Sequence, residues 1–321
     1  MQLKKALIII VTGIIFLPSF FILAQVENKA EGVTISPPIS EIQIEPGNTV
    51  VRKIKITNPI SKQIKLYPSA LDFKAKGETG EPLFLPPSLE RRSYSLASWI
   101  SFSKSFLILE PEEVEEFEYT IKVPDKAEPG GHYGVVFFAT EPPKLEEDVN
   151  KVAISTMVGS LILAKVPGQI TEKALLEEFS TDKKLYLKNN KVKIISRVAN
   201  VGNVHFKPVG EITIKNIFGK TEGKLSFNEQ TSNVLPDSIR KFENNWESKK
   251  ILVGPYTATA KYIYGESEKT LEGKVTFWII PWWLILIVAL LVLIAIYLIW
   301  RRKKKKKDKR GKDQKVIDLR R

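Results

Sequence analysis

Residues 277–300 read FWIIPWWLILIVALLVLIAIYLIW, a stretch of 24 residues without a charged side chain. A helix rises about 1.5 Å per residue, so this stretch spans roughly 36 Å, which exceeds the ~30 Å hydrocarbon core of a bilayer. A buried helix of a soluble domain seldom runs this far without a charge. The stretch therefore predicts a transmembrane α-helix near the C-terminus.

Aromatic residues gather at both ends of the predicted span. Trp278, Trp282 and Trp283 lie at its start, and Tyr297 and Trp300 lie at its end. Indole and phenol rings prefer the headgroup level of a bilayer, where they form the aromatic belts of membrane proteins. We expect these side chains to fix the depth of the helix.

A basic tail, residues 301–321, follows the span directly. It opens with Arg301, Arg302 and Lys303 and carries 13 basic and 3 acidic side chains. Lysine and arginine beside a span stay on the cytoplasmic side. We therefore expect a single-pass protein of the cytoplasmic membrane, with its tail inside and residues 26–276 outside. Contact of the tail with anionic lipid of the inner leaflet is compatible with the same pattern.

The tail also accounts for the basic composition. The net charge of the chain is +13, of which the tail contributes +10 and the two lysines at positions 4 and 5 contribute two more, so the remainder is close to neutral. The basic balance indicates membrane topology and predicts no nucleic-acid partner. There is no cysteine, which excludes disulfides, zinc–thiolate sites and a catalytic thiol.

Residues 1–24 have the features of a secretory signal peptide, with two lysines and an apolar run that leads to Ala24. Ala24 is a plausible cleavage point. Ile22 occupies the −3 position, where a small residue is usual, so cleavage and retention as a second anchor both stay open. Both outcomes export residues 26–276.

The exported part has the pattern of an all-β protein. Residues 32–168 consist of short apolar runs bounded by Pro, Gly and Asn, and residues 116–123 alternate strictly between polar and apolar side chains. A period of two is typical of a half-buried strand, and several such strands predict an immunoglobulin-like β-sandwich. Residues 74–97 interrupt the spacing, and we expect a long loop or an extra hairpin there.

Residues 170–276 repeat this scheme and predict a second immunoglobulin-like β-sandwich in tandem with the first. Four pairs of positions correspond between the two segments: Asn58 and Asn200, Pro111 and Pro236, Phe117 and Phe242, Tyr133 and Tyr256. Chance also produces such pairs in all-β chains, so duplication is an interpretation. The two tyrosines suit a tyrosine corner, in which the phenol bonds back to nearby backbone. No Pro-rich or Gly-rich spacer separates this segment from the span.

Catalytic patterns are weak. The chain has two histidines, His132 and His205, no G-x-S-x-G elbow and no H-E-x-x-H motif. S-x-x-K occurs at Ser101 and Ser180 without its accompanying boxes. The acidic run at residues 110–118 is typical of a solvated strand, and calcium binding there lacks the usual loop. We predict a protein that is not an enzyme, without a cofactor or metal site.

One cluster has the composition of a ligand site. Arg91, Arg92 and Tyr94, close to Trp99, combine cations with aromatic rings and suit an anionic glycan. Trp99 itself has the strand context of a core residue. The candidate ligand contacts are therefore Arg91, Arg92, Tyr94 and His205, although the context of His205 favours a structural role.

The chain resembles the WxL-interacting protein family of bacterial surface proteins. The resemblance rests on KIKITNP (residues 53–59), VPDKAEPGGHYGVVFF (123–138), VANVGNVHFKP (198–208), VLPDSIRKF (234–242) and VGPYTATAKYIYG (253–265). It implies a first domain that resembles a peptidoglycan-binding module and a second that engages surface or host proteins. Residues 74–97 have no counterpart, so no ligand contacts are transferred.

Two functional hypotheses follow. The first is a non-enzymatic cell-surface protein whose sandwiches bind cell-wall polymer (peptidoglycan) or surface partner proteins, by loops and strand addition. The alternative is a membrane-held assembly or chaperone component for exported, pilus-like subunits. Both have the lipid bilayer as a partner.

Overall fold

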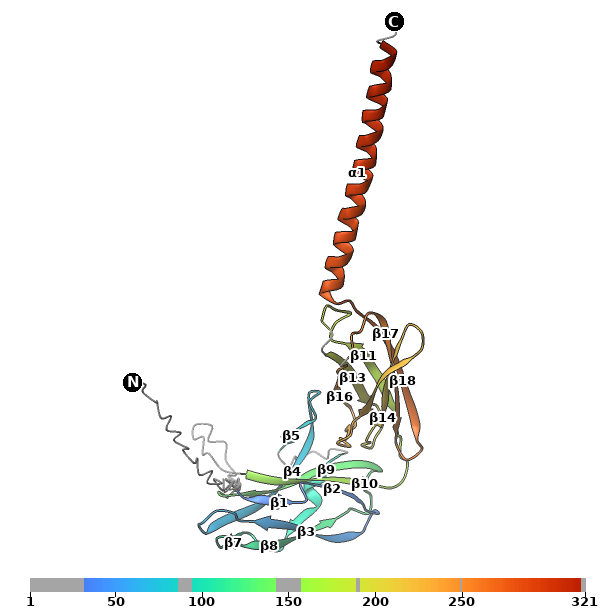
Figure 1. Cartoon of the computed structure of the whole chain (residues 1–321). Coiled ribbons are helices and arrows are strands. Elements are labelled where there is room, and N and C mark those ends of the chain that lie inside the picture. Colours follow the sequence, from blue (N-terminus) through green and yellow to red (C-terminus); the bar gives the residue numbers. More distant parts are fainter. Residues whose placement is uncertain (1–31, 86–93, 143–156, 189–190, 249, 319–321) are drawn as a thin grey trace, which may run out of the picture.

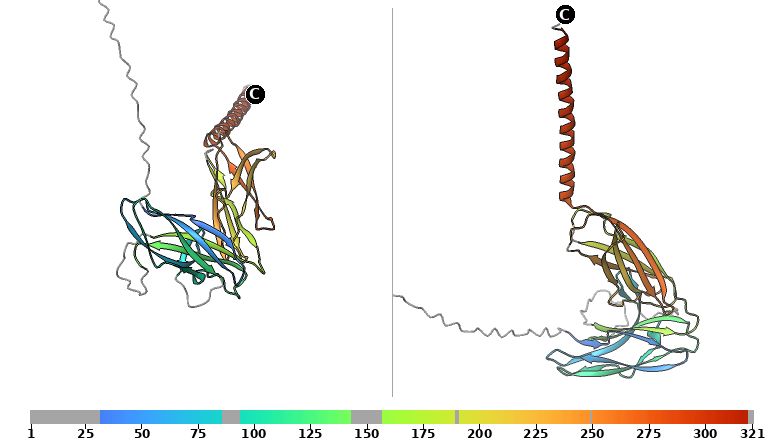
Figure 2. Two further views of the ribbon diagram at one scale, coloured as in Figure 1. Left: turned by 90° about the horizontal axis from the view of Figure 1, so that it is seen from below. Right: turned by 45° about the vertical axis from the view of Figure 1, so that its right-hand side comes forward.

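The computed structural model describes residues 32–85, 94–142, 157–188, 191–248 and 250–318, with side chains as far as Lys304. The predicted signal peptide, Arg91 and Arg92 lie outside the described residues. Two β-sandwiches stand at an angle to each other, and one long helix leaves the far end of the second sandwich (Figures 1 and 2). An all-β protein with two sandwiches and one C-terminal apolar helix is therefore what the chain forms.

The first sandwich has two sheets and a short 3₁₀ turn, η1 (Ala97–Trp99). One sheet has the order β1 (Thr34–Ser36), β3 (Thr49–Thr57), β8 (Val114–Lys122), β6 (Ile100–Phe102). The other has the order β2 (Ile39–Gln43), β10 (Met157–Val166), β9 (Gly130–Ala139), β4 (Ile64–Lys76), β5 (Glu81–Leu85), with β7 (Leu107–Leu109) paired to β4. Strand β2 runs parallel to β10, whereas the other pairs are antiparallel.

The alternating residues of β8 build the core between these sheets. Phe117, Tyr119 and Ile121 are buried, while Glu116 and Glu118 are exposed, as the period of two predicts. The ring of Phe117 meets Phe138 of β9 edge to face, with centroids 5.1 Å apart. Each such burial stabilises the fold by about 1.5–3 kcal/mol, which compensates for the missing disulfides.

Strand β9 is buried over its whole length because both of its faces are covered. On its outer face, Phe84 of β5 packs edge to face on Phe137. Buried Asp72 of β4 holds the chain that returns from the hairpin, since one carboxylate oxygen accepts the N–H groups of Leu96 and Ala97. The expected extra hairpin is thus present.

The second sandwich also has two sheets. They have the orders β11 (Ala174–Thr181), β13 (Val192–Asn200), β16 (Ser238–Trp246) and β12 (Leu185–Tyr186), β18 (Lys269–Ile279), β17 (Gly254–Tyr264), β14 (Val209–Asn216), β15 (Thr221–Phe227). At its centre the Tyr262 ring stacks on Phe227 with centroids 3.7 Å apart. The Tyr262 hydroxyl lies 2.7 Å from Ser196 Oγ, which satisfies a buried phenol.

The two sandwiches share one detailed motif, at Asn58 and Asn200. Each amide Nδ2 donates to the carbonyl four residues ahead, over 2.9 Å and 2.8 Å, and each Oδ1 accepts the N–H two residues ahead. Each Nδ2 also donates to a carbonyl two residues before a proline, that of Leu109 or Val234, over 3.2 Å and 2.9 Å. Because buried amides need such partners, the shared motif supports the inferred duplication.

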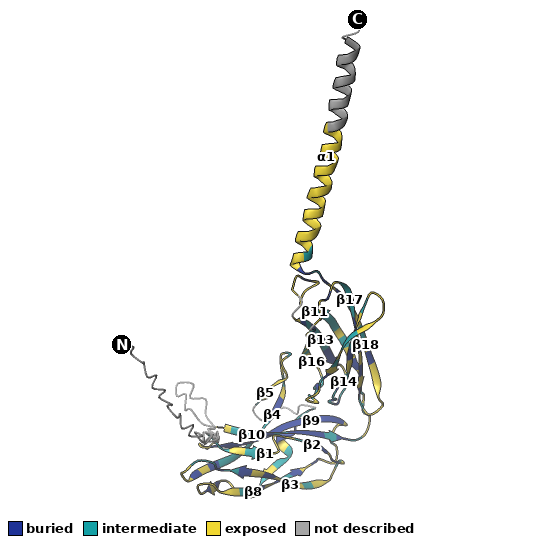
Figure 3. Cartoon of the chain, in the orientation of Figure 1, coloured by how far each residue is buried: buried dark blue, intermediate teal, exposed yellow. Residues whose placement is uncertain are grey.

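Helix α1 (Trp282–Asp318) begins later than the sequence predicts. Residues 277–279 belong to β18, where Phe277 is fully buried and Trp278 lies on the strand, half exposed. Pairing with β17 and β12 keeps these residues in the sandwich. An 18-residue stretch within Trp282–Lys304 has mean hydropathy 3.0, and none of that stretch is buried (Figure 3). Trp282, Trp283 and Trp300 are all exposed.

Candidate functional site: a pocket between the two sandwiches

The angle between the sandwiches is held by polar contacts around Asn203. Its Oδ1 accepts the N–H of Thr171 over 2.7 Å, and its Nδ2 donates to the carbonyls of Gln169 and Pro129 over 3.0 Å and 3.2 Å. Its own carbonyl accepts the N–H of Gly131 over 2.8 Å. One asparagine therefore ties the linker and β9 of the first sandwich to the second.

A second joint is formed by Tyr133 and His205. The Tyr133 hydroxyl accepts the backbone N–H of His205 over 3.0 Å and lies 3.2 Å from His205 Nδ1. Burial lowers the pKa of His205 to about 4, so the ring is neutral at pH 7 and Nδ1 accepts the phenol proton. The Tyr133 phenol thus bonds across the domain boundary, in place of the tyrosine corner that the sequence predicts.

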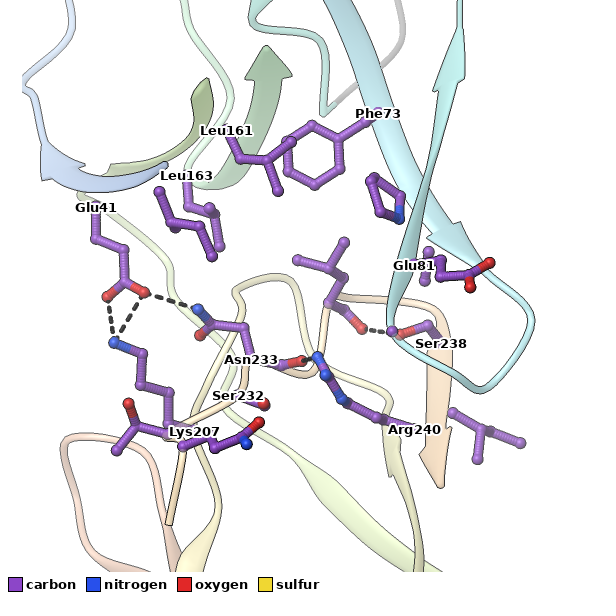
Figure 4. Close-up of a pocket in the computed structure, with 18 of the residues that line it drawn as sticks. Glu41, Phe73, Glu81, Leu161, Leu163, Lys207, Ser232, Asn233, Ser238 and Arg240 are labelled. Carbon is purple, nitrogen blue, oxygen red and sulfur yellow. Dashed lines mark hydrogen bonds and ion pairs between the residues drawn. The ribbon is translucent and has the colours of Figure 1, made fainter. Parts of the chain in front are cut away.

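Between these joints and the β4–β5 hairpin lies a pocket of about 470 Å³ (Figure 4), a volume in the range of ligand sites. The first sandwich contributes β2, β4, β10 and the hairpin, and the second contributes β16 and the loop before it. Its lining includes Glu41, Phe73, Leu161, Leu163, Asn233 and Arg240.

The floor of the pocket is apolar. Phe73 packs on Tyr133 with ring centroids 5.9 Å apart, and Leu163 joins them in a small cluster of its own, with Leu161 packed against it. This cluster lies on the outer face of the sheet, apart from the core of the first sandwich. It offers a place for an apolar side chain of a ligand.

One wall carries a charged cluster. Glu41 accepts Lys207 Nζ over 2.8 Å and Asn233 Nδ2 over 2.7 Å. Burial by itself raises the pKa of Glu41, but these two hydrogen bonds outweigh it and lower the pKa below its usual value. The Oδ1 of Asn233 is buried and accepts no hydrogen bond from the described residues. An unpaired buried acceptor costs free energy, which a donor on a ligand would recover.

The opposite wall carries Arg240. Its Nη1 donates to the carbonyl of Asn233 over 2.8 Å, and its guanidinium lies over the Phe242 ring and against Gly80 of the hairpin. No carboxylate in the described part of the chain lies within 4 Å of it, and burial lowers its pKa. Arg240 remains charged, because a guanidinium deprotonates only far above pH 7, and it keeps N–H donors for an acceptor.

Together these groups define the chemistry that the pocket offers to a ligand. The pocket offers an apolar floor, one unpaired acceptor and one cation, which match the side chain, N–H and C=O or carboxylate of an extended peptide. Ser238, two residues before Arg240 on β16, also lines the pocket, and its Oγ donates a hydrogen bond to the Leu235 carbonyl over 2.6 Å. The described residues contain no cluster of three metal-ligating side chains.

The candidate contacts predicted from sequence fall elsewhere. Tyr94 lines a different hollow of about 700 Å³, and His205 lines one of about 410 Å³. Both touch Tyr133, whose N–H donates to the Tyr94 carbonyl over 2.9 Å. Sequence reasoning missed the pocket residues, although Arg240 lies in the quoted VLPDSIRKF motif, because no local pattern indicates that this strand faces the first sandwich.

No family model matches the chain, and no curated protein matches it. Among solved structures it is similar to the class 5 fimbrial chaperone CfaA, at 16% identity and TM-score 0.38, over 76% of this chain and 98% of that one. It is also similar to the E. coli chaperone DraB, at 11% identity and TM-score 0.34, over 77% and 96%. A PapD-like domain of human CEP192 matches over 47% of this chain and 95% of that one, at 14% identity and TM-score 0.29.

Proposed function

We propose that this chain is a membrane-held, non-enzymatic binding protein that takes an extended segment of an exported polypeptide into the pocket between its sandwiches. The observation that carries the proposal is that two unused groups lie in one pocket. Arg240 has no carboxylate partner in the described part of the chain, and the buried Oδ1 of Asn233 accepts no hydrogen bond there. A peptide satisfies both at once, because its backbone alternates donors and acceptors.

Helix α1 supplies the membrane part of the proposal. Its apolar length, exposed on all sides, suits a bilayer span, and the basic tail beyond Trp300 favours a cytoplasmic location for that end. The pocket then faces the outside of the cytoplasmic membrane, where exported polypeptides emerge. A role in holding or assembling surface subunits follows from that location.

The test is peptide binding by the full-length protein in lipid nanodiscs. The probe is an array of extended peptides of about eight to ten residues with alternating apolar side chains. We expect binding that Arg240→Met weakens about tenfold, because a buried charge-assisted contact is lost. Arg52→Met is the matched control, since Arg52 is exposed on β3 of the first sandwich, outside the pocket.

Leu161→Asp tests the floor independently of the arginine. It places a carboxylate in the apolar cluster and should abolish binding of the same peptides, whereas Val51→Asp on the exposed face of β3 should not. Binding that is insensitive to both Arg240→Met and Leu161→Asp would contradict the proposal.

Cell-wall polymer is the second candidate ligand, as the resemblance to the WxL-interacting family implies. The observation in its favour is the 700 Å³ hollow, which Tyr94, Glu128, Asn203 and Asp237 line with phenol, carboxylate and amide groups. Such groups suit sugar rings and hydroxyls. Retention of purified peptidoglycan by the full-length protein, reduced by Tyr94→Ala and unaffected by Arg240→Met, would favour this candidate over the first.

A further inference from the structure

The end of the second sandwich next to helix α1 is built from four separate segments. Strand β18 ends there at Ile279, which pairs with Gly254 at the start of β17 and with Tyr186 of β12. The end of β14, Asn216, pairs with Tyr256 at the same end of β17. The β14–β15 turn, the β12 segment and the loop before β17 therefore lie at the end of the sandwich from which the helix leaves (Figure 1).

The β14–β15 turn presents an apolar tip. Phe218 is 90% exposed and Ile217 is 69% exposed. The tip is rigid, because Asn216 Oδ1 accepts the N–H groups of Phe218 and Lys220 over 3.0 Å and 3.1 Å, and Gly219 supplies the positive φ of the turn. These bonds fix the backbone of the turn with the Phe218 ring in solvent.

The other segments at this end expose apolar side chains as well. Ile251, before β17, is 74% exposed. Four further side chains at this end are about half exposed: Leu185, Leu187, Val253, Trp278. An apolar surface gathered from four segments marks a site of interaction, whereas isolated exposed residues do not.

Lysines surround these apolar residues. Lys183, Lys184 and Lys188 lie beside β12, and Lys215 precedes the β14–β15 turn; all four are exposed. None of the four has a carboxylate of the described residues within 4 Å. Their ammonium groups are therefore available to an anionic surface. Cations around an apolar patch are the composition of proteins that lie at a lipid interface.

The connection to the helix fixes the distance of this surface from the membrane. Ile280 and Pro281 alone separate β18 from α1, and both ends of the connection are bonded to the β12 segment. Ile280 N–H donates to the Tyr186 carbonyl over 2.8 Å, and Trp282 N–H donates to the Leu187 carbonyl over 3.1 Å. The sandwich cannot swing away from a bilayer that holds the helix.

We infer that this end of the second sandwich is a lipid-binding surface, on which Ile217, Phe218 and Ile251 enter the headgroup region and the surrounding lysines bind lipid phosphate. The inference rests on the proposed membrane span. It assigns the apolar surface to the bilayer and not to a protein partner, because the surface is continuous with the start of the helix. The second sandwich then stands in one orientation on the membrane.

Single-cysteine labelling tests the inference, since the chain has no cysteine of its own. Full-length Ile217→Cys, labelled with an environment-sensitive fluorophore, is reconstituted in nanodiscs of phosphatidylcholine and phosphatidylglycerol. We expect a blue shift and quenching by lipids brominated near the headgroup. Val51→Cys, on the first sandwich, should show neither, although Val51 is 58% exposed against 69% for Ile217. Adding Phe218→Ser to the labelled chain should remove most of the shift.

The control for the span itself is Leu291→Cys on α1, which lipids brominated near the bilayer centre should quench. Quenching at Leu291 with none at Ile217 would overturn the lipid-binding surface and leave the span intact. Absence of quenching at Leu291 would overturn the span, and the inference with it. A blue shift at Ile217 without lipid quenching would indicate a protein contact and would also overturn the inference.

Discussion

At the scale of the residue, the two buried asparagines do the same work in each sandwich. Asn200 donates to two carbonyls and accepts one N–H in a site that is 1% exposed. Removing a buried hydrogen-bonding group costs more than the bond itself, because its partners stay buried without water. These asparagines are therefore expected to contribute more to stability than any surface polar residue.

Asn200→Ala should lower the free energy of unfolding of the full-length protein by about 2–4 kcal/mol, since it leaves several backbone partners less satisfied and opens a cavity. Asn245→Ala, at an exposed position of β16, should change it by less than about 0.5 kcal/mol. Denaturant unfolding in detergent micelles, followed by far-UV circular dichroism, measures both. Equal effects of the two substitutions would contradict the role assigned to Asn200.

His205 makes stability depend on pH. Burial lowers the pKa of His205 to about 4 in the folded chain, against about 6.5 in the unfolded chain. Between these two values the unfolded state binds a proton at this histidine and the folded state does not. Stability is therefore complete above pH 6.5 and falls as the pH drops toward 4. The loss attributable to this residue at pH 5 is about 1–2 kcal/mol.

His205→Asn does not titrate in this range and keeps an acceptor near the Tyr133 hydroxyl. The difference in unfolding free energy between pH 8 and pH 5 should therefore be smaller in this variant than in the unchanged chain. Buried His132, whose pKa burial also lowers, is present in both and cancels in the comparison. An identical pH dependence would show that the pKa of His205 is not lowered in the folded chain.

At the scale of the element, the β4–β5 hairpin connects the sandwiches. Glu78 accepts Nε of Arg197 on β13 over 2.9 Å, and its carbonyl accepts the N–H of Lys241 on β16 over 2.9 Å. Gly80, at the tip, lies against Arg240 in the pocket wall. The hairpin therefore positions the arginine as well as bracing the two domains.

A pair of glycines on the hairpin allows a matched test. Gly77 and Gly80 both have positive φ, +58° and +82°, so alanine strains the backbone at either position. Only at Gly80 would the new Cβ meet another group, 2.3 Å from Cζ of Arg240. Because the guanidinium is the end of a flexible side chain, Gly80→Ala should displace it and weaken peptide binding by the full-length protein in nanodiscs, whereas Gly77→Ala should leave that binding unchanged.

The strands were predictable from the sequence because their cause is local. The alternation around Phe117 follows from the period of a pleated strand, and the helix follows from the absence of charge. The boundary between strand β18 and helix α1 was not predictable, because the apolar residues 277–279 suit a buried strand end and a membrane helix equally. Pairing with β12 and β17, which are distant in sequence, decides it.

The pocket was not predictable for the same reason. Phe73, Leu161 and Arg240 lie on three strands that meet only when the sandwiches dock. Each has an ordinary local context, so no single segment indicates a site. One signal was present in the sequence of β16. Arg240 lies two residues before Phe242, so the strand period puts a cation on the same face as an aromatic residue. The sequence analysis chose His205 as a ligand contact. The residue does lie at the interface between the sandwiches, but there its ring bonds to Tyr133.

At the scale of the whole molecule, the second sandwich acts as a spacer of fixed length. Strand β17 has 11 residues and runs from the helix end to the first sandwich, a length of roughly 35 Å at about 3.3 Å per residue. The joints at Asn203 and Tyr133 hold the first sandwich at an angle to it. The pocket is thereby presented at a constant height above the proposed membrane surface.

This arrangement predicts the outcome of labelling from one side of the membrane. In intact cells stripped of outer barriers, a membrane-impermeant maleimide should react with Val51→Cys, which is exposed on the first sandwich. A cysteine appended after Arg321 should react only once the cells are permeabilised, because the proposed topology keeps the basic tail inside. The reverse pattern would place the pocket in the cytoplasm, where no exported polypeptide is held after secretion, and the proposed function would fail together with the orientation.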